Sequence, residues 1–257
     1  MAVASMGQSS IRNPRKFNTL GSAAKFVATG GQVTEVGGYK LHIFTSSSDF
    51  VVYDGFKQLE VFLVAGGGGG GSGSAYGQGG GGGGGGGEVL ETATTVPLGF
   101  GQYPVLVGAG GALNTDGNDS SFLQFTALKG LKGILNGGAG GDSGNGFTGG
   151  ALSVFSGGGG AGASADGGIA STYSHQSRKY TAVGGNGGAG ITSDFSGSSL
   201  YYAGGGGGGA TTGPYSFDGV TAAAQGASAG GQVSNQGGGG YKNAAGHSGV
   251  VIVRYAI

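Results

Sequence analysis

The chain has 257 residues, and its 70 glycines give glycine about four times the share usual in globular proteins. Its 12 basic and 12 acidic side chains cancel and make up only 9% of the residues, so we expect no charge-driven binding to nucleic acid or to an anionic membrane surface. There is no cysteine, and the three histidines (His42, His175 and His247) are far apart in sequence, so we expect no disulfide, no metal site and no cofactor.

The first 28 residues are polar and mildly basic and include no acidic side chain. We interpret residues 1–28 as an attachment arm, with Arg12, Arg15, Lys16 and Phe17 as its contact residues. The arm has no uninterrupted apolar core like that of a secretion signal. No window of the chain reaches the roughly 18 apolar residues of a membrane span, so we predict no membrane insertion.

The segment after the arm alternates apolar and polar residues in short stretches separated by turn signals. The pattern predicts a meander of β-strands at 32–36, 39–45, 49–54 and 58–65. The β-branched segment 249–257 predicts a last strand, which we expect to pair with 58–65. Regions 29–65 and 249–257 would then form a β base from which the intervening chain makes one long excursion.

Weaker strand patterns follow at 88–96, 103–111 and 120–128. No segment keeps apolar residues at helical spacing without glycine between them. We therefore expect a mainly β protein with almost no α-helix.

Glycine runs recur through the excursion, at 66–71, 79–87, 157–160, 204–209 and 237–240. Ordering a glycine costs about 0.5 to 1 kcal/mol more than ordering an alanine, so ordered runs need compensation from close backbone packing; disordered runs would be linkers. Each run is flanked by large apolar residues, which favours packing. Collagen is excluded, because there are 4 prolines and no strict three-residue glycine register. We predict extended polyglycine II helices, bundled over residues 66–248 on the small β base, with 79–87 reaching about 28 Å.

The order of motifs resembles the glycine-rich domain of bacteriophage tail-fibre and tail-tip proteins. The motifs are TGGQVTEVGGYKLHIFTSSSDF, then LEVFLVAGGGGGG, then YPVLVGAGGALNTDGNDSSF, then glycine-rich repeats, then GHSGVVIVRY, and they span residues 29–257. More distantly, the chain is similar to the adhesins at the tips of T-even-type long tail fibres, in which stacked polyglycine helices hold loops against a host receptor.

The resemblance implies a virion protein of the tail fibre or tail tip. Its partners would be a bacterial surface receptor, either an outer-membrane protein or a polysaccharide, and other phage fibre or tail proteins. A homotrimer is one option for its oligomeric state.

Glycine has no side chain for recognition, so contact residues are sought between the runs. Segment 164–183 is the densest in cations and aromatic rings, a composition typical of binding loops. The predicted receptor-contact residues are Tyr173, His175, Gln176, Arg178, Lys179 and Tyr180 in that segment, Phe195, Tyr201 and Tyr202 before the run 204–209, and Tyr215 and Phe217 after it. The alternative for the first group is a solvated loop, or tyrosines packed against the side of the bundle. For Tyr201, Tyr202, Tyr215 and Phe217, aromatic caps over the ends of a glycine helix are the favoured interpretation.

The sequence carries no signature of an enzyme. Chance matches to G-x-G-x-x-G do not lie between a strand and a helix, and no G-x-x-x-x-G-K-[ST] motif is present. Asp116 and Asp119 lack the rest of a calcium loop and fit a turn, and His42 falls in a predicted strand. We predict a non-enzymatic receptor-binding adhesin. The main alternative is a structural cap or joint of the virion; an ice-binding protein and a disordered chain are further ones.

Overall fold

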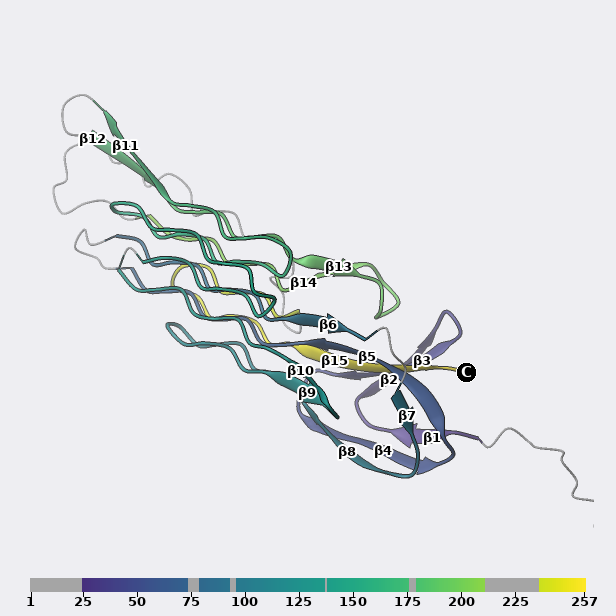
Figure 1. Ribbon diagram of the computed structural model, residues 1–257. Coiled ribbons are helices and arrows are strands. Elements are labelled where there is room, and N and C mark those ends of the chain that lie inside the picture. The colour runs from purple at the N-terminus through teal and green to yellow at the C-terminus, as the bar shows by residue number, and fades with distance from the viewer. Residues whose placement is uncertain (1–24, 74–78, 93–95, 137, 176–178, 211–235) are drawn as a thin grey trace, which may run out of the picture.

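The structure is a computed structural model that describes residues 25–73, 79–92, 96–136, 138–175, 179–210 and 236–257. This part of the chain is an elongated body, with a β base at one end and closely packed extended segments along the rest of its length (Figure 1). The described residues form strands, turns and extended segments and no α-helix, which confirms the predicted mainly β class.

The base consists of two antiparallel sheets. The first has the strand order β1 (Val27–Thr29), β4 (Ser48–Asp54), β8 (Gly101–Leu106), β9 (Ser120–Phe122) and β10 (Phe125–Ala127). The second has the order β2 (Gln32–Val36), β3 (Tyr39–Phe44), β15 (Val250–Ala256), β5 (Lys57–Val64) and β6 (Val89–Glu91), with β7 (Val96–Leu98) paired to the start of β5. Two hairpins lie outside these sheets: β11 (Ser171–His175) with β12 (Lys179–Val183), and β13 (Ile191–Ser193) with β14 (Leu200–Tyr202).

The strands predicted at 32–36, 39–45, 49–54, 58–65 and 249–257 lie within one residue of their predicted bounds. The weaker predictions are less accurate, since 120–128 is a hairpin of two strands and the strands at 88–96 and 103–111 end early, and the predicted meander is wrong. β2 and β3 are paired neighbours, whereas β4 lies in the other sheet, between β1 and β8. The reason is packing, because β4 buries Phe50 and Val52 against the second sheet. The last strand pairs with β5, as predicted, and with β3 on its other side. β1 begins at Val27, so the sheet starts two residues inside the segment assigned to the arm.

β5 and β15 are the central strands of the base and are buried on both faces. On one face Val61 and Val253 pack against the first sheet. On the other face Phe62 and Ile252 pack against Phe195 and neighbouring residues of the β13–β14 hairpin. Burial on two sides explains why both strands are continuously apolar rather than alternating in the sequence.

The glycine runs are held by backbone hydrogen bonds that repeat every three residues. In the run 66–71, Gly66 and Gly69 donate to segment 115–118, Gly67 and Gly70 to segment 244–247, and Gly68 and Gly71 to the run 79–87, at N···O distances of 2.7 to 3.0 Å. Successive residues therefore face three directions in turn, as in an extended helix with three residues per turn. None of the glycines in 66–71 has a positive φ. The full set of dihedral angles that defines polyglycine II stays a prediction.

Three of the glycine-rich segments are surrounded by other backbones. The run 66–71 also accepts hydrogen bonds from segments 108–114, 130–133 and 237–243, so six backbones enclose it. The run 79–87 and segment 157–162 are enclosed in the same way. We call these three segments the middle layer. The outer segments beside them include interrupted ones such as 129–134 as well as the glycine runs 204–209 and 237–240.

The close contacts explain which positions must be glycine. A Cβ added at Gly83, in the middle layer, would lie 1.9 Å from the carbonyl oxygen of Gly206. In the outer segment 129–134, glycine is kept only at Gly130 and Gly133, where a Cβ would lie 2.1 Å from a carbonyl oxygen of the middle layer. The enclosed runs 66–71 and 79–87 are thus glycine at every position, whereas the outer segment 129–134 keeps glycine only at every third position.

Candidate functional site

The two ends of the body expose different parts of the chain. The C-terminal end of the chain lies at the base end (Figure 1), and so does Lys25, whose carbonyl oxygen would lie 3.1 Å from a Cβ at Gly55, between β4 and β5. The opposite end, which we call the tip, is formed by the turns at 112–115, 134–136, 151–156 and 241–244 and by the β11–β12 hairpin (Figure 1). The packed segments hold these tip elements at a distance from the base.

The β11–β12 hairpin projects beyond the other tip elements (Figure 1). Its strands pair from Ser171 opposite Val183 to His175 opposite Lys179. The base of the hairpin is attached to the neighbouring turn, since Ser156 Oγ donates to the Ser171 carbonyl at 3.2 Å and the Thr172 hydroxyl donates to the carbonyl of Val154. A rigid body therefore carries a projecting hairpin whose starting point is fixed.

The structure places part of the predicted contact segment at the tip. Tyr173 lies on β11 with 58% of its surface exposed. His175, Lys179 and Tyr180 lie on the paired strands, although their side chains are outside the described part. Gln176 and Arg178 lie outside the described residues, as do Tyr215, Phe217 and the predicted attachment residues Arg12, Arg15, Lys16 and Phe17.

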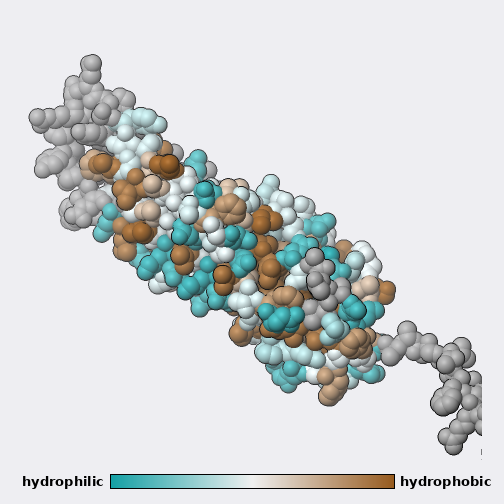
Figure 2. Space-filling view, in the orientation of Figure 1, coloured by the Kyte–Doolittle hydropathy of each residue, from teal (hydrophilic) through white to brown (hydrophobic). Residues whose placement is uncertain are grey.

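Large apolar side chains are exposed at the turns of the tip. They are Leu113 (41% exposed), Ile134 (53%), Leu135 (42%), Leu152 (54%), Val154 (63%) and Tyr241 (47%). Figure 2 shows hydrophobic residues at this end of the body, as well as along its flank and at the base. Turns usually carry polar residues, so apolar turns at one end favour a contact surface. These residues do not stand out in the sequence, because no dense cluster of aromatic and charged side chains marks them.

Asparagines shape three of the tip turns. Asn114, Asn136 and Asn243 have φ values of 64°, 54° and 63°, the left-handed conformation that asparagine tolerates better than most residues. The Asn114 side-chain oxygen accepts a hydrogen bond from the amide of Ser72 at 2.8 Å, and that of Asn243 accepts one from Gly73 at 3.2 Å. These two side-chain oxygens are therefore used inside the fold, and the leucines beside Asn114 and Asn136 remain exposed.

Phe195 and Tyr202 are buried, with 1% and 2% of their surface exposed, so they do not lie at the surface as a receptor contact would. For Tyr202 this burial agrees with the structural role favoured from the sequence. Both rings pack on Phe62, with centroids 5.3 and 5.0 Å away, and the Arg254 guanidinium lies 3.7 Å from the centroid of the Phe195 ring. The physical reason is that the second face of the β5–β15 sheet needs an apolar cover, and this hairpin supplies it. Tyr201 is 57% exposed, but it lies on the same hairpin, beside the base rather than at the tip.

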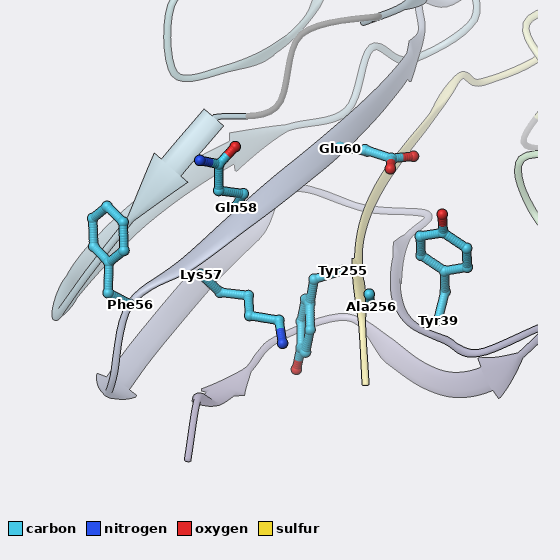
Figure 3. Close-up of a pocket in the computed structure, with 7 residues that line it drawn as sticks. All are labelled: Tyr39, Phe56, Lys57, Gln58, Glu60, Tyr255 and Ala256. Carbon is cyan, nitrogen blue, oxygen red and sulfur yellow. The ribbon is translucent and has the colours of Figure 1, made fainter. Parts of the chain in front are cut away.

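A cavity of about 500 Å³ opens at the base where β5 and β15 separate. The two strands pair only as far as Glu60 opposite Arg254; beyond this point β5 pairs with β7, and β15 continues along β3. The cavity, which we call the base groove, is lined by Tyr39, Phe56, Lys57, Gln58, Glu60, Tyr255 and Ala256 (Figure 3). Lys57 and Glu60 extend into the gap from β5, and Tyr39 faces it from β3 (Figure 3).

The described residues contain no group of three or more His, Asp or Glu side chains that could hold a metal ion. In the same part of the chain, no helix is long and apolar enough to cross a membrane.

His42 is a core residue, as its position in a predicted strand suggested. Its Nδ1–H donates to the Gly30 carbonyl at 2.8 Å, and its Nε2 accepts from the Tyr255 hydroxyl at 3.3 Å. Burial lowers the pKa of His42 below its ordinary value of 6.5, so the imidazole is neutral at pH 7.

The family model for a glycine-rich domain matches residues 44–256. The chain belongs to this glycine-rich domain family. The matched residues include most of the base and the whole set of glycine runs. No curated protein matches the sequence.

Proposed function

We propose that this protein is a receptor-binding adhesin at the tail-fibre tip or tail tip of a bacteriophage, and that it acts without enzymatic chemistry. The observation that carries the proposal is the tip itself: a body held together by its backbone presents a fixed hairpin and exposed apolar turns at the end opposite both Lys25 and Ile257. Binding residues often lie on loops held by a rigid scaffold. The motif resemblance to phage tail-fibre proteins supports the virion as the location.

The receptor would be an outer-membrane protein or a polysaccharide of the bacterial surface, bound by Tyr173 and the apolar turns. Several fibres on one virion would make weak single contacts add up to firm attachment. Other fibre or tail proteins would hold the opposite end, and the assembled form could be a homotrimer.

The experiment measures binding of the fluorescently labelled protein to a panel of bacterial strains. We expect binding to some strains only, and we expect Tyr173→Ser and Val154→Ser to weaken it at least tenfold without changing the melting temperature. Tyr201→Ser is the matched control, because Tyr201 is 57% exposed and Tyr173 58% exposed, but Tyr201 lies beside the base. Equal loss in the control, or no binding to any strain that the parent phage infects, would contradict the adhesin proposal.

A structural cap or joint of the virion is the second candidate. Exposed apolar turns would serve equally well in a permanent contact with another virion protein. In that case the isolated protein would bind phage particles through the tip, and Tyr173→Ser would reduce incorporation into particles rather than binding to cells.

A further inference from the structure

The base end carries exposed aromatic rings that the tip function does not use. Phe100 is 81% exposed, Phe56 64% and Tyr53 57%. The three residues are neighbours. A Cβ at Gly99, next to Phe100, would lie 3.6 Å from the Phe56 ring. Val52 of β4 pairs with Gly101 of β8, and the same register places Tyr53 opposite Phe100. Clustered exposed aromatic residues are typical of protein-binding surfaces.

The aromatic cluster continues into the base groove through Phe56, which lines both. One wall of the groove is the edge of β15 beyond Arg254, and in the described part of the chain no strand pairs with that side of Tyr255 and Ala256. A groove beside a free strand edge fits an extended peptide, whose backbone can pair with the edge while alternate side chains enter the groove.

The charge of the groove indicates the sign of its occupant. Glu60 is neutralised inside the fold, because Arg254 Nε and Nη2 donate to its Oε2 at 2.8 and 2.7 Å. Among the described residues no acidic side chain pairs with Lys57, whose side chain extends into the groove (Figure 3). The charge left over in the groove is therefore positive.

The position of the groove indicates which kind of partner reaches it. The chain that precedes β1 enters the base here, since the Phe26 ring packs edge-on against Tyr255 at 4.8 Å and a Cβ at Gly55 would lie 3.0 Å from the Phe26 Cα. The groove and the place where the arm joins the body are thus one surface, at the end away from the tip.

We propose that the base groove and its aromatic cluster dock an extended segment of another virion protein, one that alternates apolar side chains with a carboxylate. This inference rests on the proposed adhesin function. The apolar side chains would cover Phe56 and Phe100, and the carboxylate would meet Lys57. Attachment to the virion would then use folded residues of the base and not the arm alone.

The test uses particles of the parent phage made without this protein, mixed with the purified full-length chain and separated by sedimentation. We expect the wild-type chain to sediment with the particles. Phe56→Ser, Phe100→Ser and Lys57→Glu should each need at least a tenfold higher concentration for half-maximal incorporation. Each variant should keep the melting temperature and the cell binding of the wild type.

Matched controls lie away from the groove: Lys132→Glu on the flank of the body and Tyr241→Ser at the tip. Loss of incorporation in the base variants, with both controls unchanged, supports the docking proposal. Equal incorporation of base variants and wild type overturns it and leaves the adhesin proposal standing. Failure of the wild-type chain to join particles or to bind cells overturns both.

Discussion

Gly83 offers the sharpest test of the enclosed glycine segments, because a single methyl group there has no space. In Gly83→Ala the new Cβ would lie 1.9 Å from the Gly206 carbonyl oxygen and 2.5 Å from its carbon, so the two backbones must move apart by more than 1 Å, judged against the roughly 3.5 Å of a carbon contact. The hydrogen bonds of Gly83 with Gly158 and of Gly141 with Gly83, at 2.9 and 2.8 Å, lie in the affected region.

The expected loss of stability follows from three terms. Overpacking costs about 1 to 3 kcal/mol, and two to four weakened backbone hydrogen bonds cost about 1 kcal/mol each. The alanine itself stabilises the folded protein by about 0.5 to 1 kcal/mol, because it restricts the unfolded chain more than glycine does. The net destabilisation is about 2 to 6.5 kcal/mol, which at about 2 to 4 °C per kcal/mol lowers the melting temperature by about 4 to 26 °C in a chain of this size.

The assay is thermal and denaturant unfolding of the purified variant. Gly99→Ala is the matched control, since its Cβ would meet the Phe56 ring at an ordinary 3.6 Å, and Gly99 has no positive φ. We expect the control to melt within about 2 °C of the wild type. If Gly83→Ala also melts within that range, the argument that enclosed backbones require glycine is refuted.

Two further predictions concern the base. Burial lowers the pKa of His42 in the folded state. Neutral His42 therefore contributes stability that is complete above pH 6.5 and is lost as the pH falls below 6.5 toward the folded-state pKa. Burial also lowers the pKa of His247, which changes stability with pH in the same direction. His42→Gln should therefore flatten, but not abolish, the fall in unfolding free energy between pH 8 and 5, and an unchanged slope would contradict the role given to His42. Arg254→Lys keeps the positive charge but loses the stacking on Phe195 and the two contacts with Glu60. We expect a cost of about 1 to 2 kcal/mol and faster amide exchange in β13 and β14, whereas unchanged exchange there would show that Arg254 does not hold the hairpin.

The strands of the base could be read from the sequence because each is a short apolar stretch between turn signals. The pairing of β15 with β5 followed from their matched continuous hydrophobicity. The division of the strands between two sheets did not, because local pattern does not say whether β4 continues beside β3 or crosses to face it. Only the packing of Phe50 and Val52 against the second sheet decides this.

The candidate site was predictable in part. The segment around Tyr173 stands out by composition, and the structure places this residue at the tip. Phe195 and Tyr202 have the same kind of composition around them, yet they cover the base, because the need for a cover on β5 and β15 arises only once the sheet exists. The exposed leucines of the asparagine turns were missed because their sequence, Leu-Asn after a small or apolar residue, resembles ordinary turn sequence.

The central claim is that the glycine runs are ordered by backbone hydrogen bonds, and amide hydrogen exchange tests it most directly. Isolated linkers would exchange within seconds, whereas amides bonded inside a cooperative structure exchange only when it opens. We predict that the amides of 66–71 and 82–87 exchange as slowly as those of β15. Exchange of these amides at the rate of an unstructured chain, while β15 stays protected, would contradict the account.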